Sequence, residues 1–415
     1  MASKKLKKFA GTLSFSKTSA KIFIALGAIS LVSACSNFSF GPDIGTSNIS
    51  NFPQQNFNQV LPNASGEIIG SGEVRVALLL PLSGSAGLSS VGISMANGAR
   101  LAMDFINNNP SIANNITLVI KDTQGDVNIA SNLATQAVNE GASLILGPLK
   151  AQNVIAAGNI AKAANIPLIG FSNNSSAASS GVYLLNLLPK SELRRSLSYA
   201  RSKGSISFVA ITSTSAFGQI QRNAFNAASL ELGLNTIGSY SFSNEDEARN
   251  AVETIIPLIQ SGQVDTIFLP DRATAPSIAI LLEAAGIDRA KLRIIGSADW
   301  ENDLNIAQTP YLLGAIFPAI DDAGHLALRP QYSAKYGSNP HPFTTITYTA
   351  TLLANSSTLA KSTPRYDRAI LTRDSGFKGR DGLFRFLVNG QSEYALIIKS
   401  VANGGSIRVD GPRLP

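Results

Sequence analysis

Short apolar runs alternate with amphipathic stretches from residue 74 onward. The runs are continuous over a strand's length, which is typical of parallel strands covered on both faces. They occupy Val74–Leu80, Ile116–Asp122, 142–148 and 166–172. Stretches with helical spacing separate them, at 92–109, 128–141 and 153–165. This alternation predicts an α/β fold with a doubly wound, mostly parallel sheet and right-handed crossovers.

The same plan begins again at residue 206 and predicts a second lobe. Its apolar runs lie at 206–218, 236–243, 264–270 and 292–300, with helical stretches between them. Hinges are expected near 188–195 and 317–322. Helical 348–361 and strand-like 381–388 are expected to complete the first lobe, and 394–409 the second. The predicted division is 73–190 with 320–388 for the N-terminal lobe, and 191–319 with 389–415 for the C-terminal lobe.

The N-terminal segment predicts export and lipid anchoring. Lysines precede an apolar run of about a dozen residues, which is short for a membrane span of roughly 20. The run ends in LVSA before Cys35, the single cysteine of the chain. Small residues directly before a lone cysteine resemble a bacterial lipobox, so 1–34 is interpreted as a lipoprotein signal peptide and Cys35 as the lipidation site. An ordinary secretory signal with a chance cysteine is the alternative.

The segment 35–72 is interpreted as a flexible tether. From residue 36 to residue 72 it contains no lysine or arginine and is rich in Ser, Asn, Gly, Pro and Gln. Such a composition does not bury enough apolar surface to order itself.

The formal charge of +7 is carried mostly by the signal segment. Six lysines and no acidic residue precede Cys35, so removing them takes the charge from +7 to +1. No basic stripe remains to support nucleic-acid binding.

The loops after the predicted strands do not carry an enzyme's motifs. Gly84 and Gly87 lack the spacing of a dinucleotide loop, and no phosphate-binding G-x-x-x-x-G-K-[ST] occurs. The stretch at 170–174 begins like a nucleophile elbow but has no second glycine. Two separated histidines and one cysteine make a zinc site improbable. We therefore expect no catalytic activity, no metal and no cofactor.

The loops do carry hydroxyls, side-chain amides and backbone N–H groups at helix starts. Open parallel sheets place ligand sites at the carboxyl ends of their strands. Such groups bind a small polar ligand, particularly a carboxylate. The alternative is that Ser and Asn only cap helices.

The chain resembles a known family in the order of its segments. VALLLPLSGSAG, NGARLAMDFINNN, ASLILGP and IPLIGFS are similar to the leucine/isoleucine/valine-binding family of type I periplasmic binding proteins. These proteins deliver amino acids and amides to ABC transporters. The resemblance runs from residue 74 to about 404 and implies a ligand between two lobes, which close about the hinge.

The resemblance also implies site residues and a role for Asp299, which would be the counter-ion of an amino group. In the first lobe the implied residues are Ser83, Gly84, Leu149, Lys150, Gln152, Ser172 and Asn173. In the second lobe they are Phe217, Asp271, Asp299 and Trp300, with Phe343 as a wall of the pocket. Lys150–Ala151 and Tyr348–Thr349 depart from the family's usual residues at these places.

GPLKAQNV and the stretch 170–200 look more like a neighbouring group of the same fold. These are lipoproteins described as penicillin-binding-protein activators, which contact a peptidoglycan synthase. The expected partners are therefore a small polar ligand and an ABC transporter permease, or a peptidoglycan synthase. Either role implies a periplasm-facing lipoprotein of the bacterial cell envelope, held at the membrane by its lipid anchor.

Overall fold

The computed structural model describes residues 61–414, which carry two α/β lobes. The predicted signal peptide, Cys35 and most of the predicted tether lie outside these residues. Each lobe is built on one large, mostly parallel sheet, as the sequence predicts. No helix among residues 61–414 combines the length and the apolar character that a membrane span needs.

The first-lobe sheet has six strands in the order β1-β3-β2-β4-β5-β6. All its neighbours are parallel except β1 and β3. The strands are β1 (Glu67–Ile69), β2 (Val74–Leu80), β3 (Ile116–Asp122), β4 (Leu144–Leu146), β5 (Leu168–Gly170) and β6 (Val182–Leu184). The helices of this lobe are α1 (Ala86–Asn107), α2 (Val127–Asn139), α3 (Ala151–Ala163), α9 (Ala323–Tyr336), α10 (Thr344–Asn355), α11 (Ser357–Ala360) and α12 (Arg368–Leu371).

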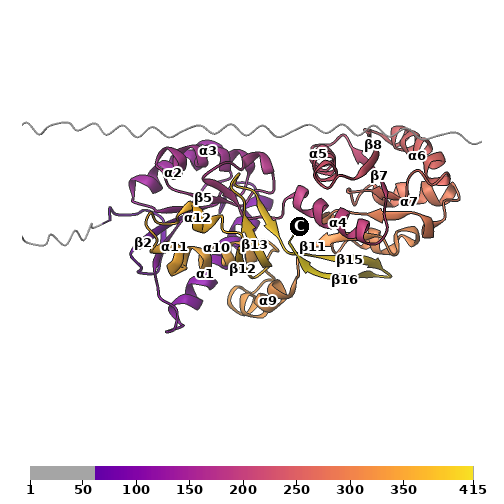
Figure 1. The fold of residues 1–415 in the computed structure, drawn as a ribbon. Helices are drawn as coiled ribbons and strands as arrows, with labels where there is room; N and C mark the ends of the chain where they lie inside the picture. Colours follow the sequence, from indigo (N-terminus) through magenta and orange to yellow (C-terminus); the bar gives the residue numbers. More distant parts are fainter. Residues whose placement is uncertain (1–60, 415) are drawn as a thin grey trace, which may run out of the picture. The chain divides into compact units, whose positions relative to one another are not determined.

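Successive residues of β2 supply opposite faces of the first sheet, as strand geometry requires. Leu78 and Leu80 pack under α1 and α10, whereas Ala77 and Leu79 pack under α2 and α3. Figure 1 shows these two helical layers on opposite sides of the sheet. Burial on both faces explains why β2 is apolar at every position except Arg75.

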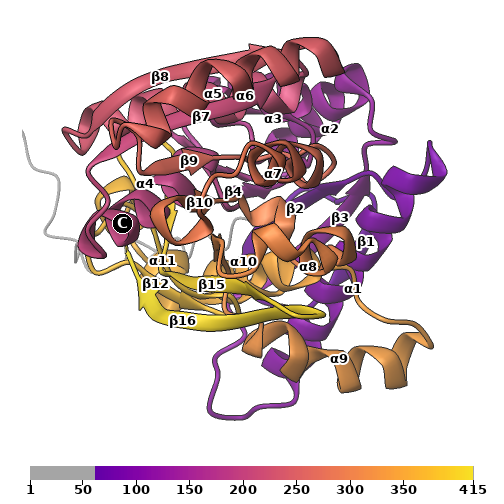
Figure 2. The ribbon, with the colours of Figure 1, turned by 90° about the vertical axis from the view of Figure 1, so that its right-hand side faces the viewer.

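The second-lobe sheet has seven strands in the order β16-β15-β11-β10-β9-β7-β8. Its parallel strands are β7 (Ser207–Ser213), β8 (Asn235–Phe242), β9 (Thr266–Phe268), β10 (Arg293–Ile295) and β11 (Ile316–Ala319). The antiparallel pair β15 (Leu396–Ala402) and β16 (Gly405–Arg413) extends it, and Figure 2 shows β8 and β16 at its two edges. Its helices are α4 (Pro189–Ser202), α5 (Ala216–Glu231), α6 (Glu245–Gln260), α7 (Ala275–Ala284) and α8 (Leu304–Gln308), with a short helix η3 (Ala298–Trp300).

The chain passes between the lobes three times. It does so between β6 and α4, between β11 and α9, and between β14 (Ser392–Tyr394) and β15. The first passage ends where the predicted hinge 188–195 begins, since 189–195 belong to α4, and the second lies within the predicted range 317–322. The predicted boundary at 388 differs from the structure, because β14 pairs with β13 (Gly382–Phe386), which pairs with β12 (Phe377–Gly379). Tyr394 packs in the first-lobe core, so the first lobe extends a few residues beyond the predicted boundary at 388.

The last part of the predicted tether is folded into the first lobe. β1 pairs antiparallel with β3, and the backbone N–H of Ser65 donates to Glu140 Oε1 at 3.0 Å. Lys121 Nζ donates to the carbonyl of Ser65 at 2.5 Å and lies 2.9 Å from Glu140 Oε2. The interpretation of 35–72 as a tether is therefore wrong for residues 61–72. These residues are held by β3 and by the buried charges of Lys121 and Glu140, and the composition of the segment does not reveal such tertiary partners.

Candidate functional site

A cavity of about 550 Å³ lies where the chain crosses between the lobes. We call it the hinge cavity. The chain at the first two crossings supplies Asn186, Leu187, Ala319, Ile320 and Asp322. The second lobe adds Ala298, Glu301, Asn302 and Lys399. The first lobe adds His325, Leu326, Arg329, Pro342, Phe343, Thr345, Ile346 and Asp381. Both lobes and their connections therefore form the same cavity, so a change in the angle between the lobes would change its shape.

Lys399 brings two acidic groups together at this cavity. It lies on β15, and its Nζ is 2.9 Å from Glu301 Oε1 and 3.7 Å from Asp322 Oδ2. The Lys399 side chain is only 11% exposed, so its charge is held away from bulk water. Such a charge is stabilised by its carboxylate partners. These contacts connect β15 to the loop after η3 and to the hinge before α9.

Two buried polar atoms of the cavity lining have no hydrogen-bond partner among the described residues. They are Glu301 Oε2 and His325 Nδ1. A buried polar atom without a partner costs free energy that a bound group can recover. Glu301 Oε2 accepts hydrogen bonds only, so an N–H or O–H group of a ligand satisfies it.

Burial shifts the titration of two lining side chains. Burial raises the pKa of Asp381 to about 6, against the opposing effects of a hydrogen bond from Thr345 and of the Arg380 charge. Burial and the Arg329 charge lower the pKa of His325, against the attraction of Asp322. At neutral pH His325 is therefore neutral, and one of its ring nitrogens accepts while the other donates.

The rest of the lining is largely apolar. Leu187, Ile320, Leu326, Phe343 and Ile346 contribute side chains to it. Phe343 begins α10, and its ring packs edge-on against His341 with centroids 5.0 Å apart. An apolar wall with a few fixed polar groups is typical of a small-molecule site.

The predicted first-lobe residues gather at the carboxyl ends of neighbouring strands, but none of the seven lines the hinge cavity. Ser83 Oγ donates to Asp122 Oδ2 at 2.6 Å. Gly84 has a φ of +98°, and a Cβ at this position would clash with the carbonyl of Gln124. Lys150 Nζ donates to the carbonyl of Gly125 at 3.0 Å. The hydroxyl of buried Ser172 accepts from the Asn174 N–H at 3.1 Å. The remaining predicted residues of this lobe are half-buried Leu149 and exposed Gln152 and Asn173.

None of the four predicted second-lobe residues lines the hinge cavity, although Asp299 and Trp300 lie between its lining residues Ala298 and Glu301 in the chain. Asp299 pairs with Arg272, whose Nε is 3.4 Å from Asp299 Oδ2. Burial raises the pKa of Asp299, against the Arg272 charge. Asp271 Oδ1 accepts from the Ala273 N–H at 2.9 Å, and half-buried Phe217 lies in the first turn of α5.

Trp300 differs from its predicted role. It is 1% exposed and packs in the second-lobe core, with its ring 6.4 Å from that of Phe317. A Cβ on Gly296 would approach the Trp300 ring to 2.2 Å, so this glycine is needed for the close packing. Trp300 therefore neither walls nor fills the hinge cavity. Among the twelve predicted ligand-binding residues only Phe343 lines it.

Sequence reasoning missed Glu301, His325, Asp381 and Lys399. One signal was present for Lys399, which is the single charge inside the apolar run of β15. Glu301 follows directly after the predicted pair Asp299–Trp300. His325 and Asp381 carry no comparable signal, because neither belongs to a recognisable motif.

The model of the family described as periplasmic binding protein matches residues 73–369 of the chain. Curated protein sequences include no match. Solved structures share the fold. A Rhodospirillum rubrum protein assigned to branched-chain amino acid ABC transport is 19% identical, with a TM-score of 0.67 over 81% of this chain and 99% of its own.

Two other solved structures hold different ligands. An ABC transporter substrate-binding protein from Desulfitobacterium hafniense, in complex with Leu, is 17% identical, with a TM-score of 0.58 over 81% of this chain and 99% of its own. A solute binding protein from Rhodopseudomonas palustris, in complex with 3,4-dihydroxy benzoic acid, is 18% identical. Its TM-score is 0.53 over 82% of this chain and 98% of its own. The match to the family model covers more than half of the sequence, so the chain belongs to the periplasmic binding protein family.

Proposed function

We propose that this protein is a lipid-anchored, non-enzymatic receptor that binds a small amino-acid-like or amide ligand between its lobes. The observation that carries the proposal is the unpartnered Glu301 Oε2 in a largely apolar cavity lined by both lobes. An ammonium or amide N–H satisfies this oxygen, and an apolar side chain of the ligand packs against Phe343 and Ile346. The ligands of two solved structures of the same fold, Leu and 3,4-dihydroxy benzoic acid, also combine an apolar body with polar groups.

Ligand binding at this place would favour lobe closure. A ligand shifts a conformational equilibrium only by binding one state more tightly than the other. The hinge cavity meets this condition, because its lining comes from both lobes and from two of the three chain crossings. We infer that the closed form then meets an ABC transporter permease. Cys35 would hold the receptor at the membrane on the periplasmic side.

A thermal-shift screen of the purified protein tests the ligand class. The panel contains amino acids with apolar side chains, their amides, and aliphatic and aromatic carboxylates. A ligand at a hundred times its dissociation constant adds about 2.7 kcal/mol to the free energy of unfolding, which is easily seen as a rise in Tm. We expect the largest rise from compounds that join an N–H donor to an apolar group.

The matched variants are Glu301→Gln and Glu253→Gln. Glu253 lies exposed on α6, away from the cavity. The Glu301 change replaces a carboxylate of the cavity lining and should reduce the rise in Tm, whereas the Glu253 change should leave it intact. The proposal is wrong if no compound raises Tm, or if both variants respond as the unaltered protein does.

One contact favours a second candidate, the penicillin-binding-protein activator. Arg272 already pairs with Asp299, the residue that the family resemblance assigns to an amino group. In a protein that no longer binds an amino-group ligand, Arg272 could occupy the place of that amino group beside Asp299. Co-purification of a peptidoglycan synthase with the protein, together with a panel that leaves Tm unchanged, would favour this role over transport.

A further inference from the structure

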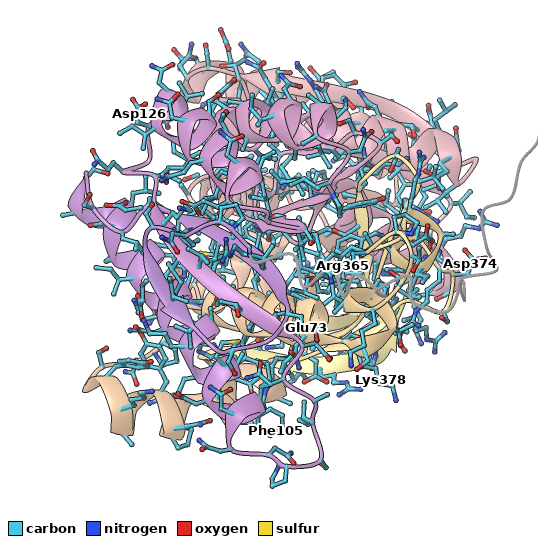
Figure 3. The ribbon with its side chains drawn as sticks, turned by 90° about the vertical axis from the view of Figure 1, so that its left-hand side faces the viewer. Glu73, Phe105, Asp126, Arg365, Asp374 and Lys378 are labelled. Atoms are coloured by element: carbon cyan, nitrogen blue, oxygen red, sulfur yellow. The ribbon has the colours of Figure 1, made fainter. Side chains whose placement is uncertain are left out.

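A second hollow, of about 420 Å³, lies on the first lobe between α1, α10 and the β12–β13 hairpin. We call it the basic groove, after Arg373, Lys378 and Arg380 in its lining. It shares no lining residue with the hinge cavity. Figure 3 shows Phe105, at its α1 side, and Lys378, at its hairpin side, toward the same end of the molecule. The basic groove is therefore a separate surface feature.

Aromatic rings fix both arginines of the groove. The guanidinium carbon of Arg373 is 4.3 Å from the Phe377 ring centroid, and its Nε donates to the carbonyl of Gly376 at 3.0 Å. The guanidinium carbon of Arg380 is 4.5 Å from the Tyr348 ring centroid, and one of its terminal nitrogens donates to the Tyr348 hydroxyl at 3.0 Å. A guanidinium held flat on a ring loses little freedom when its remaining N–H groups bind a carboxylate.

No carboxylate of the described residues forms an ion pair with Arg373, Lys378 or Arg380. No acidic side chain belongs to the lining. Of the acidic neighbours in sequence, Asp374 is exposed, and Asp381 lines the hinge cavity but lies close enough to Arg380 for the Arg380 charge to lower its pKa. Arg373 and Lys378 have no such neighbour in the lining, so the hollow keeps a net positive charge that favours an anion.

The helical side of the groove is apolar. Phe105 is 41% exposed at the end of α1, and Leu352 of α10 also belongs to the lining. An exposed aromatic residue next to fixed arginines is typical of protein interfaces, where aromatic residues and Arg are enriched. The groove therefore offers a carboxylate site and an apolar site side by side.

We propose that the basic groove is a docking site for a partner protein that presents a carboxylate side chain next to an apolar one. The carboxylate binds the guanidinium groups and Lys378, and the apolar neighbour covers Phe105. Charge complementarity selects an acidic partner, and the exposed Phe105, Arg373 and Lys378 make the groove accessible to a protein surface. This docking is independent of any ligand in the hinge cavity.

Fluorescence anisotropy with labelled peptides tests the proposal on the full-length protein. The probes are hexapeptides with blocked ends that alternate Glu with Leu or Phe, and matched peptides with Gln in place of Glu. We expect the acidic peptides to bind at least about tenfold more tightly than the Gln peptides, because a charge-assisted hydrogen bond contributes more than a neutral one. Higher salt should weaken the acidic peptides selectively.

Lys378→Glu is the test variant and Lys162→Glu is its control. Both lysines are exposed in the first lobe, but Lys162 lies on α3, away from the groove. The Lys378 change should lower the affinity for acidic peptides about tenfold or more, while the Lys162 change should leave it unaltered. Phe105→Ser should lower it without changing the salt dependence.

Three results would overturn the proposal. The first is equal binding of the Glu and Gln peptides. The second is an equal effect of the Lys378 and Lys162 changes. The third is a different occupant: self-association in sedimentation that Lys378→Glu abolishes, or binding to phosphatidylglycerol vesicles in place of peptides.

Discussion

Lys399 Nζ lies 2.9 Å from Glu301 Oε1, which joins the C-terminal part of the chain to the loop after η3 beside the hinge. The lysine side chain is 11% exposed and the glutamate side chain 26%. The pair therefore lies between a surface ion pair and a buried one. Its loss should affect both the stability of the second lobe and the cavity between the lobes.

Lys399→Met should lower the free energy of unfolding by about 1–3 kcal/mol, because it leaves Glu301 partly buried without its counter-charge. Urea unfolding measures this loss. Arg249→Ala is the control, since it removes an exposed pair with Glu245 on α6 and should change stability by less than about 0.5 kcal/mol. Equal effects of the two changes would contradict the role given to Lys399.

Trp300→Ala should cost about 3–5 kcal/mol, because it opens a cavity in a well-packed core. Trp300→Phe should cost clearly less, because the indole Nε1 is buried without a hydrogen-bond partner in the described structure and its removal carries no hydrogen-bond penalty. Thermal unfolding compares the two. Leu230→Ala, at an 85% exposed position, should have almost no effect. A mild Trp300→Ala phenotype with altered ligand binding would instead restore Trp300 to the ligand site.

Glu192 should make the protein less stable as the pH rises toward neutral. It is buried in the first turn of α4, accepts from the Ala298 N–H at 3.1 Å, and burial raises its pKa from 4.5 to about 7. Between these values the folded state binds more protons than the unfolded state. This contribution is therefore complete below pH 4.5 and is lost as the pH rises through 7, on the order of 3 kcal/mol.

Glu192→Gln should flatten this dependence, since glutamine keeps an acceptor for Ala298 and does not titrate. Urea unfolding at a series of pH values from 4 to 8 measures the slope. Glu253→Gln, on the exposed side of α6, should retain the slope of the unaltered protein. A slope unchanged in Glu192→Gln would show that another group is responsible.

Removal of residues 1–72 should destabilise the first lobe more than removal of residues 1–60. The longer deletion takes away β1 and the Ser65 contacts of Lys121 and Glu140, and it leaves β3 as an unprotected edge. We expect a difference of at least about 2 kcal/mol in the free energy of unfolding. Glu67→Gln in the shorter deletion is the control, because it breaks only the partly exposed pair with Arg100. Equal stability of the two deletions would restore residues 61–72 to the tether.

The sequence predicts the two sheets because their strands are buried on both faces. Their central residues, 76–80 in β2 and 208–211 in β7, are apolar without alternation, and the helices between strands are regular in spacing. β1 escapes prediction because its three residues lie in a polar, glycine-containing stretch and their partners come from β3. The pairing that holds β1 is tertiary, and local pattern does not show it.

The candidate site is predicted less well than the fold for a physical reason. Parallel-sheet topology brings Ser83, Lys150 and Ser172 to the carboxyl ends of neighbouring strands of the first sheet. The hinge cavity, however, is lined by residues of β15 and α9, and each of these elements follows a crossing of the chain from one lobe to the other. Lys399 and Glu301 are far apart in the chain, and only the folded crossing brings them together.

The pairing of β1 with β3 has a mechanical consequence. Any pull transmitted along the chain from residue 60 reaches β1 first and is borne by the first lobe alone. The second lobe is joined to the first by three crossings of the chain and by contacts beside them, such as the ion pair between Arg194 and Glu393. The path from residue 60 into β1 includes none of these crossings, so tension applied there loads the first lobe without acting across the hinge.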